Sequence, residues 1–197
     1  MGDSTEQLTI FVIDDARSSC RELLHRLKSI GYVAITFESP RRFLANADFS
    51  GIGCVISDLF MPEINGLQLL WELQERRVPW PVIVISALAR VENAVELLQS
   101  GALTLLEKPV ETERLREAVG RAIDVCRKRR RMIDRLNHIQ SRLSLLSAEE
   151  RDVMNRMLQG VPHKSIAQEL DISTRTVDRR RHDIHHILGV ANLPELT

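Results

Sequence analysis

Along roughly the first 110 residues, short apolar runs alternate with longer amphipathic stretches. Short apolar runs, partly β-branched and bounded by turn-forming residues, are typical of strands; they occupy 8–13, 33–37, 54–57, 82–86 and 103–106. The amphipathic stretches between them are typical of helices and lie near 16–30, 39–47, 66–76 and 90–100. This alternation predicts an α/β fold with a doubly wound, five-stranded parallel sheet that is covered by helices on both faces.

From Glu111 the pattern changes to a single long helix. One stripe of this helix recurs at alternating spacings of four and three residues, and it consists of Leu115, Val119, Ala122, Cys126, Arg129, Ile133, Leu136, Gln140 and Leu143. Two interpretations of the 112–143 helix stay open: a seam for a dimer, or a connecting helix whose stripe packs on its own domain. Because the basic run 127–131 crosses the stripe, any coiled coil is expected to be weak or conditional.

The last segment has the pattern of a helix-turn-helix. Ser147 and Glu150 have the spacing of a capping box that starts a helix. Further helices are predicted over 163–170 and from Thr174 to about Leu188, and three residues join them. Two helices joined by so short a turn predict a small all-α helix-turn-helix domain.

Two domains therefore follow: residues 1–125, and residues 144–197, with the 112–143 helix overlapping the end of the first. Residues 1–125 contain 13 Lys and Arg against 18 Asp and Glu, whereas 126–197 contain 14 against 9 and hold five of the six His. An acidic first half suits a metal or phosphoryl site, and a basic second half suits a polyanion. Solvated surfaces of accidental sign are the plainer alternative.

Cysteine usage and hydropathy predict a cytoplasmic protein. The cysteines Cys20, Cys54 and Cys126 are odd in number and widely spaced, which favours small apolar residues over a disulfide framework or a zinc site. No apolar run approaches the ~18 residues of a membrane span, and the first residues lack the basic and apolar order of a signal peptide. We expect no membrane partner.

Acidic residues end two strands that a doubly wound sheet makes neighbours. Asp14 and Asp15 follow the first strand, and Asp58 ends the third. Clustered carboxylates repel one another unless a cation joins them, so this edge predicts a Mg²⁺ site. Lys108 and Ser86, at the ends of the fifth and fourth strands, add the cation and hydroxyl that hold a transferred phosphoryl group. Each residue alone is more often a cap, a turn former or a solvated group, but the set predicts one site.

Four segments, FVIDDA, ISDLFMP, VISA and LLEKP, together resemble the receiver domain of two-component response regulators. The resemblance implies that Asp58 is the nucleophile phosphorylated by a histidine kinase. The implied Mg²⁺ (or Mn²⁺) ligands are Asp15, Asp58, the backbone carbonyl of Phe60 and, through water, Asp14. The implied phosphoryl contacts are Lys108, Ser86 and the backbone amide of Ala87. Such a receiver catalyses only its own phosphorylation and dephosphorylation, so we expect no enzyme acting on an external substrate.

One position departs from that family pattern. Receivers usually place an aromatic residue on the fifth strand as partner of the Ser/Thr switch, and here Leu105 stands there. The phosphorylation chemistry is expected to be intact. The conformational signal is expected on the surface of the fourth helix, fifth strand and fifth helix. Because Leu105 replaces the usual aromatic partner of Ser86, a phosphorylation-independent regulator stays open as an alternative. A third alternative, an aspartyl-phosphate hydrolase, requires a second acid two residues after Asp58, where Phe60 stands.

Residues 143–197 resemble the LuxR-type helix-turn-helix, and the whole chain resembles the NarL/FixJ class of response regulators. In such domains the second helix of the motif enters the major groove of double-stranded DNA. The expected DNA-binding residues are Lys164, Arg175, Thr176, Asp178, Arg179, Arg180 and His182. Arg179 is preferred for guanine readout, and Lys164, Arg175 and Thr176 for phosphate. Arg181 is expected nearer the packed side, where the resemblance implies a pair with Glu150.

The resemblance also implies a homodimer. Its formation is expected to depend on phosphorylation and in this way to regulate transcription. The family usually continues with a fourth helix after the segment LGV, whereas this sequence ends at Thr197. Three explanations stay open: a very short helix, a truncated chain, or dimer contacts made by the 112–143 helix and the receiver.

Overall fold

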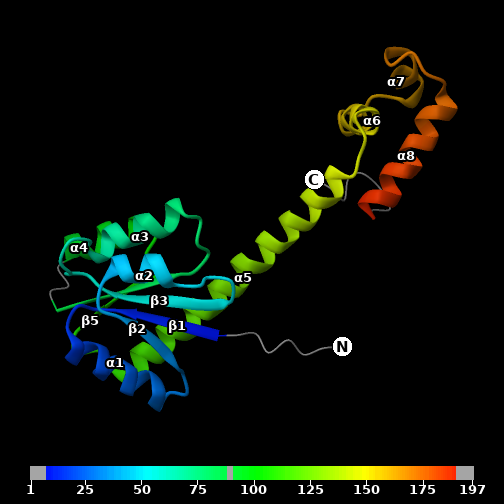
Figure 1. The fold of residues 1–197 in the computed structure, drawn as a ribbon. Coiled ribbons are helices and arrows are strands. Elements are labelled where there is room, and N and C mark those ends of the chain that lie inside the picture. The colour runs from blue at the N-terminus through cyan, green and yellow to red at the C-terminus, as the bar shows by residue number, and fades with distance from the viewer. Residues whose placement is uncertain (1–7, 88–90, 190–197) are drawn as a thin grey trace. The chain divides into compact units, whose positions relative to one another are not determined.

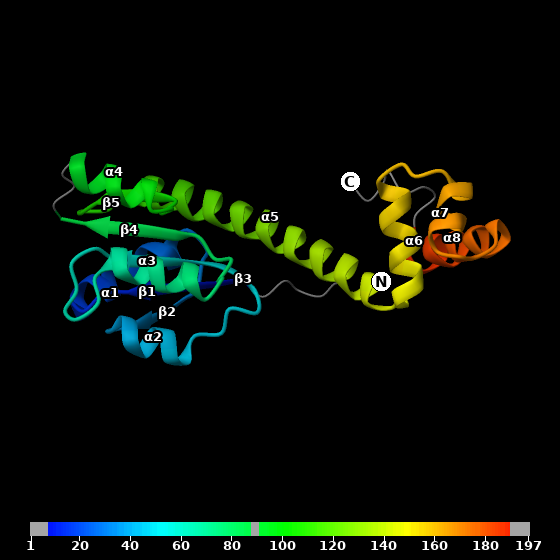
Figure 2. The same ribbon diagram turned by 90° about the horizontal axis from the view of Figure 1, so that it is seen from above.

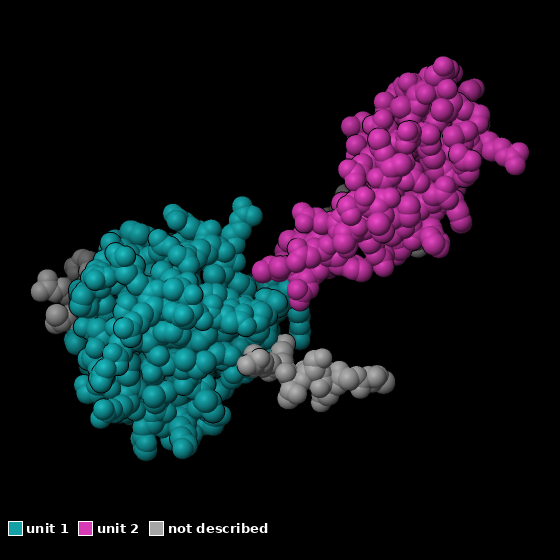
Figure 3. All heavy atoms as spheres, viewed as in Figure 1, with its two compact units in different colours: residues 1–131 teal, residues 132–197 magenta. Residues whose placement is uncertain are grey.

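The structure, a computed structural model, describes residues 8–87 and 91–189. The chain divides into two compact units, residues 1–131 and residues 132–197 (Figure 3). Each unit has a hydrophobic core of its own. The division falls inside one long helix, α5 (Thr112–Ser144), which contributes residues to both units.

Unit 1 is a five-stranded parallel sheet. Its strands are β1 (Leu8–Ile13), β2 (Ala34–Phe37), β3 (Ile52–Asp58), β4 (Val82–Ser86) and β5 (Thr104–Glu107), in the order β2-β1-β3-β4-β5. The connecting helices are α1 (Arg17–Ser29), α2 (Pro40–Asn46), α3 (Gly66–Glu75) and α4 (Val91–Gln99). Figures 1 and 2 show α2, α3 and α4 on one face of the sheet and α1 with the start of α5 on the other. The predicted doubly wound sheet is confirmed.

The strand order brings two strand ends together. From β1 the chain passes outward to β2 and then returns to β3 on the other side of β1. Ile13, the last residue of β1, is in register with Ser57 of β3, so Asp14 and Asp58 follow side by side. In open α/β sheets this reversal point is where ligands bind. Every residue of β3 and β4 is buried, as expected for strands that are covered on both faces.

A close approach of backbone and ring fixes the start of β3, which begins two residues before the predicted strand. Gly53 is in register with Thr9 of β1, and the Trp80 indole lies against it while donating to the Gly51 carbonyl at 3.0 Å. A Cβ at position 53 would collide with the Thr9 carbonyl oxygen and lie 2.6 Å from two Trp80 ring carbons. Only glycine fits there.

The three cysteines are free and buried, which agrees with the prediction that they serve as small apolar residues. Burial, followed by the nearby Cys126 thiol, raises the pKa of Cys54 to about 12. Cys54 therefore stays a thiol at neutral pH, and a thiol is neither a nucleophile nor a metal ligand until it is deprotonated.

Unit 2 is all helical. After the end of α5 it comprises α6 (Ala148–Leu158), α7 (His163–Glu169) and α8 (Thr174–Leu188). The predicted capping box is confirmed: the Glu150 amide donates to the Ser147 hydroxyl at 3.2 Å, and the Ser147 amide donates to the Glu150 carboxylate at 2.8 Å. The helices enclose a small core of Leu146, Val153, Met154, Ile166, Ala167, Val177, Ile184 and Leu188. The predicted helix-turn-helix is thus formed by α7 and α8.

The stripe along α5 has two different environments. Its first four members, Leu115, Val119, Ala122 and Cys126, are buried in the core of unit 1. Further along, Leu136 is 53% exposed, and Leu143 packs partly against the core of unit 2. Packing on its own domain therefore accounts for the first half of the stripe, and the second half is largely open.

The fourth helix that the family resemblance implies would fall on residues 190–197, outside the described residues. Within residues 8–87 and 91–189, no helix is both long enough and apolar enough to cross a membrane.

We predict that Gly53→Ala destabilises unit 1 by roughly 1 to 3 kcal/mol, because the added methyl group forces β1 and Trp80 to move. Both tryptophans of the chain, Trp71 and Trp80, belong to unit 1, so the urea midpoint of tryptophan fluorescence measures the effect. Gly120→Ala is the matched control: its Cβ meets nothing within 4 Å in α5, and alanine is favoured over glycine in a helix by about 1 kcal/mol. Equal midpoints for the two variants would contradict the close approach.

Candidate functional site

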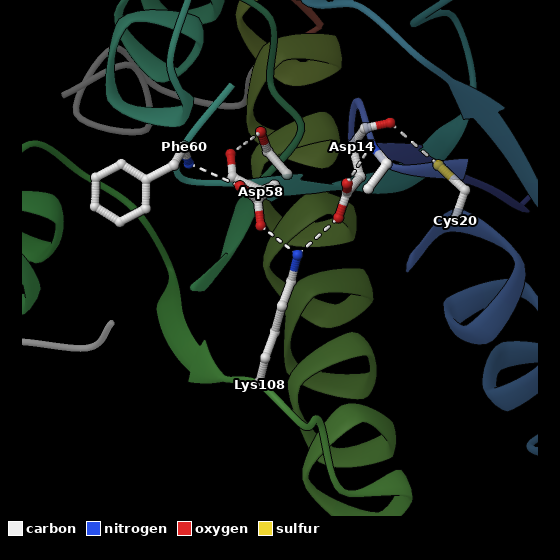
Figure 4. Close-up of polar contacts among 7 residues, drawn as sticks. Asp14, Cys20, Asp58, Phe60 and Lys108 are labelled. Carbon is white, nitrogen blue, oxygen red and sulfur yellow. Dashed lines mark hydrogen bonds and ion pairs between the residues drawn. The ribbon is translucent and has the colours of Figure 1, made fainter. Parts of the chain in front are cut away.

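Two buried carboxylates and one lysine meet at the carboxyl edge of the sheet. Asp14 follows β1 and is 2% exposed, and Asp58 ends β3 and is 8% exposed. The Lys108 ammonium lies between them, 2.8 Å from Asp14 Oδ2 and 2.5 Å from Asp58 Oδ1 (Figure 4). Both acids are thus held out of water by a shared cation, which is the condition for keeping buried charges.

The backbone of β4 and β5 fixes where Lys108 lies. Lys108 directly follows β5, and its amide donates to the Ser86 carbonyl at 2.9 Å. Its peptide bond to Pro109 is cis. Burial by itself lowers the pKa of Lys108, but hydrogen bonds and charges from Asp14 and Asp58 outweigh this and raise the pKa above its ordinary value. The side chain is therefore a permanent cation at neutral pH.

Backbone amides engage the remaining oxygens of both acids. The Phe60 amide donates to Asp58 Oδ2 at 2.7 Å, and the Ala16 amide donates to Asp14 Oδ1 at 2.9 Å. The Cys20 thiol donates to the Asp14 carbonyl at 3.3 Å. The Phe60 ring itself is 55% exposed and points away from Asp58 (Figure 4). The Phe60 and Ala16 donors are backbone amides placed by the turns after β3 and β1. Any residue type except proline can supply such an amide, so the sequence carries no signal for them.

The other residues expected at this edge have more varied positions. Ser86 ends β4 and is fully buried, whereas the next residue, Ala87, is exposed. Asp15 is exposed as well. The structure brings two carboxylates into contact through a lysine and does not gather three acids. Within residues 8–87 and 91–189, no group of three or more His, Cys, Asp or Glu side chains is arranged to hold a metal ion.

Leu105 lies on β5 in register with Val84 of β4 and packs, half-buried, against the core of unit 1. Ser86 is in register with Glu107, two residues further along β5. Leu105 and Ser86 thus belong to adjacent strands at the same end of the sheet.

In unit 2, α8 has one packed face and one polar face. Val177, Ile184 and Leu188 are buried, and the Ser173 hydroxyl caps the helix by accepting from the Thr176 amide at 3.1 Å. The expected DNA-binding residues divide by exposure: Arg175, Asp178, Arg179 and His182 of α8 and Lys164 of α7 are exposed, whereas Thr176 and Arg180 are half-buried. The helix therefore offers several cations to solvent.

A contact between α7 and α8 was not expected from the sequence. The His163 ring, at the first position of α7, lies with Nδ1 3.1 Å from Asp178 Oδ1. Asp178 therefore has a partner within unit 2. Residues 15 positions apart carry no periodic signal, so only the packing of the two helices reveals the pair.

As expected, Arg181 lies on the packed side of α8, four residues after the buried Val177 and three before the buried Ile184. Its side chain is nevertheless exposed, whereas that of Arg180 is half-buried. The pKa of Glu149 is lowered by its own backbone N–H, then by the Ser147 hydroxyl and, more weakly, by the Arg180 charge. The carboxylate of Glu150 accepts from the Ser147 amide.

Two families match this chain. Residues 10–120 match the response regulator receiver domain, and residues 144–197 match the LuxR family of bacterial regulatory proteins. The transcriptional regulatory protein FixJ of Rhizobium meliloti (strain 1021) is 35% identical over 188 residues, which cover 95% of this chain and 92% of that protein. The response regulator protein TodT of Pseudomonas putida is 32% identical over 187 residues, 95% of this chain and 82% of its own.

Solved structures give the same result. The match to the response regulator StyR has a TM-score of 0.83 at 29% identity and covers 96% of this chain and 96% of that one. Full-length FixJ from B. japonicum has a TM-score of 0.59 at 32% identity, covering 95% of this chain and 93% of that one.

We predict that Lys108→Met destabilises unit 1 at neutral pH, because it leaves two buried carboxylates without their shared cation. The natural ammonium stays charged at every pH below its ordinary pKa of 10.5, and its contribution is lost only as the pH rises through the raised folded-state value. The urea midpoint of tryptophan fluorescence at about pH 7 measures the loss of stability.

Lys128→Met, which removes an exposed lysine from α5, is the control and should follow the natural protein. A midpoint of the Lys108→Met variant equal to that of the natural protein would show that Lys108 does not neutralise the two acids.

Proposed function

Because the chain belongs to the response-regulator family, with a receiver domain followed by a LuxR-type DNA-binding domain, we propose that phosphorylation of Asp58 controls its assembly on DNA. It is a two-component regulator of transcription and not an enzyme on external substrates. A receiver implies a histidine kinase as one partner, and a LuxR-type domain implies DNA as the other. Both partners would act on it in the cytoplasm.

The observation that carries the proposal is the Lys108 ammonium at 2.5 Å from the buried Asp58 carboxylate. In the proposed transfer, an Asp58 oxygen bonds to phosphorus as the bond from phosphorus to the kinase imidazole nitrogen breaks, and the imidazole, which carries a proton on its other ring nitrogen, leaves neutral. Lys108 neutralises charge on the incoming phosphoryl oxygens. The amide that donates to Asp58 from Phe60 helps to orient the nucleophile. Catalysis is then positioning and charge neutralisation.

A divalent cation fits the oxygen donors of this edge. Receivers generally bind Mg²⁺ at the phosphorylation site, and Mg²⁺ commonly takes one or two carboxylates and retains water. Asp15, Asp58 and the Phe60 carbonyl would hold Mg²⁺ or Mn²⁺ directly. Asp14 would act through water. When bound, the ion neutralises charge between the carboxylates and the phosphoryl group.

The remaining receiver residues would transmit the change. The Ser86 hydroxyl and the Ala87 amide would close on the phosphoryl oxygens, and Leu105 on the neighbouring strand would follow Ser86 inward. An aliphatic side chain fills less space than the usual ring and has no polar tip. The switch would therefore rely on packing alone, and it would alter the surface of α4, β5 and α5.

DNA recognition is assigned to α8 and the start of α7. Arg179 is exposed and has a planar guanidinium that can pair with both acceptors of guanine. Lys164, Arg175 and Thr176 would contact phosphates, and Arg180 and His182 would flank them. Asp178 would orient the start of α7 through His163, besides any contact with cytosine.

We predict that acetyl phosphate with Mg²⁺ adds one phosphoryl group per chain and increases DNA affinity, and that Asp58→Asn abolishes both effects. Intact-protein mass spectrometry measures the first, and fluorescence anisotropy with a DNA site selected by the full-length protein measures the second. Glu75→Gln, at the exposed end of α3, is the charge-matched control and should behave as the natural protein. Phosphorylation without a change in affinity would instead support the phosphorylation-independent regulator.

We also predict that Arg179→Ala weakens binding to the selected site by about 1 to 3 kcal/mol and leaves binding to scrambled DNA nearly unchanged. Arg175→Ala should weaken binding to both DNAs and reduce the salt dependence of affinity, as expected for a phosphate contact. Arg181→Ala removes another exposed arginine from the same helix and serves as the control. If Arg179→Ala weakened binding to both DNAs equally, Arg179 would instead be a phosphate contact.

A further inference from the structure

The second half of α5 exposes apolar side chains that the core of unit 2 does not cover. Met132 is 65% exposed and Leu136 is 53% exposed, one helical turn apart. Ile133 and Ile139 lie beside them and are half-buried. Ile133 and Leu136 continue the stripe that the core of unit 1 buries further up the helix, and Met132 and Ile139 flank it. Large aliphatic side chains recurring on one face of an exposed helix are typical of a packing surface.

The charges around this stripe are arranged as in a self-pairing helix. In the heptad that begins at Cys126, the central positions after the basic run are Ile133, Leu136, Gln140 and Leu143. The positions that flank the centre, where two parallel helices would face each other, carry no charge: Met132, Asn137, Ile139 and Ser144. The charged side chains and the histidine all fall on the outer positions: Arg131, Asp134, Arg135, His138 and Arg142.

We infer that residues 132–143 of α5 pair with the same segment of a second copy of this chain, as a parallel two-stranded coiled coil. A parallel homodimer sets each flanking residue against a flanking residue of the same sequence, so a run of like charges there would oppose it. This segment avoids that penalty. A helix from a different protein would be selected by complementary flanking charges, and the segment offers none.

Gln140 adds a preference for register. It is exposed and occupies a central position of the heptad between the aliphatic residues Leu136 and Leu143. In a parallel dimer the two Gln140 amides can hydrogen-bond to each other, whereas a shifted register would bury an amide against an aliphatic side chain. A polar residue at such a position specifies alignment at a cost in stability. The self-pairing surface is therefore specific but weak.

The weakness has a regulatory consequence, and here the inference rests on the proposed function. Two heptads with one polar central residue are marginal by themselves, so pairing needs a second contact between the copies. Phosphorylation of the receiver would supply that contact by changing the α4, β5 and α5 surface. The paired helices would bring two copies of α8 together, which suits DNA with two half-sites.

Cross-linking tests the surface directly. In a parallel dimer in register, the two Leu136 side chains meet, so Leu136→Cys should form a disulfide between copies when copper phenanthroline and oxygen oxidise the two thiols. Arg135→Cys, one residue away on the outer face, is the matched control and should cross-link at least tenfold more slowly. The natural cysteines are buried and do not compete. Both variants change exposed residues and should fold.

The same samples are examined by mass spectrometry for phosphorylation and by light scattering for oligomeric state. Faster cross-linking of the Leu136→Cys variant in the phosphorylated protein supports the inference. Equal rates for the two variants overturn it, as does a dimer by light scattering without a Leu136→Cys cross-link. A chain that stays monomeric when phosphorylated and bound to DNA also overturns it.

Substitution of Gln140 gives a readout that does not require phosphorylation. Gln140→Leu should raise the dimer fraction of the unmodified protein at a given concentration, and Gln140→Glu should lower it, because an aliphatic pair stabilises the seam and a charged pair opposes it. If acetyl phosphate fails to modify the chain, the proposed function fails while this comparison still decides the surface. No difference between the two Gln140 variants overturns the inference.

Discussion

The contact of one lysine with two buried carboxylates is the constraint on which the receiver site depends. Asp14 and Asp58 are almost completely enclosed, and Lys108 compensates the charge of both. Taking such acids out of water without a cation would be costly. Their enclosure also keeps the Asp58 carboxylate in a fixed orientation, with a backbone amide from the next loop on its second oxygen. The same features suit a nucleophile whose work is positioning.

The sheet topology supplies this contact. Asp14 and Asp58 come from strands separated by a complete β-α unit, and Lys108 follows a strand at the far edge. Because all five strands are parallel, their carboxyl ends meet at one side, and the reversal at β1 sets the two acids next to each other. Tight packing below the site, such as the Trp80 ring against Gly53, holds β1 and β3 in register. The register in turn fixes the spacing of the carboxylates.

Helix α5 shows how a single periodic pattern can serve two structural purposes. Its stripe enters the core of unit 1 over Leu115 to Cys126 and emerges into solvent by Leu136. The helix continues to Ser144, well beyond Cys126, the last of its buried residues. Such a continuation leaves aliphatic residues available to another copy, and the uncharged flanks of the segment restrict which partner fits. In this way the element that completes the receiver core also carries the surface through which we propose that two copies associate.

The sequence by itself determined the elements and the composition of the candidate site. Strand alternation, the capping box of Ser147 and Glu150, and acids at strand ends are local patterns, and the parallel topology then implied that Asp58 and Lys108 share an edge. Only the tertiary structure decided which side chains touch: Lys108 lies between two acids while Asp15 stays exposed, and His163 lies against Asp178. These contacts join residues far apart in the chain. They depend on how neighbouring elements pack, and no local period encodes that.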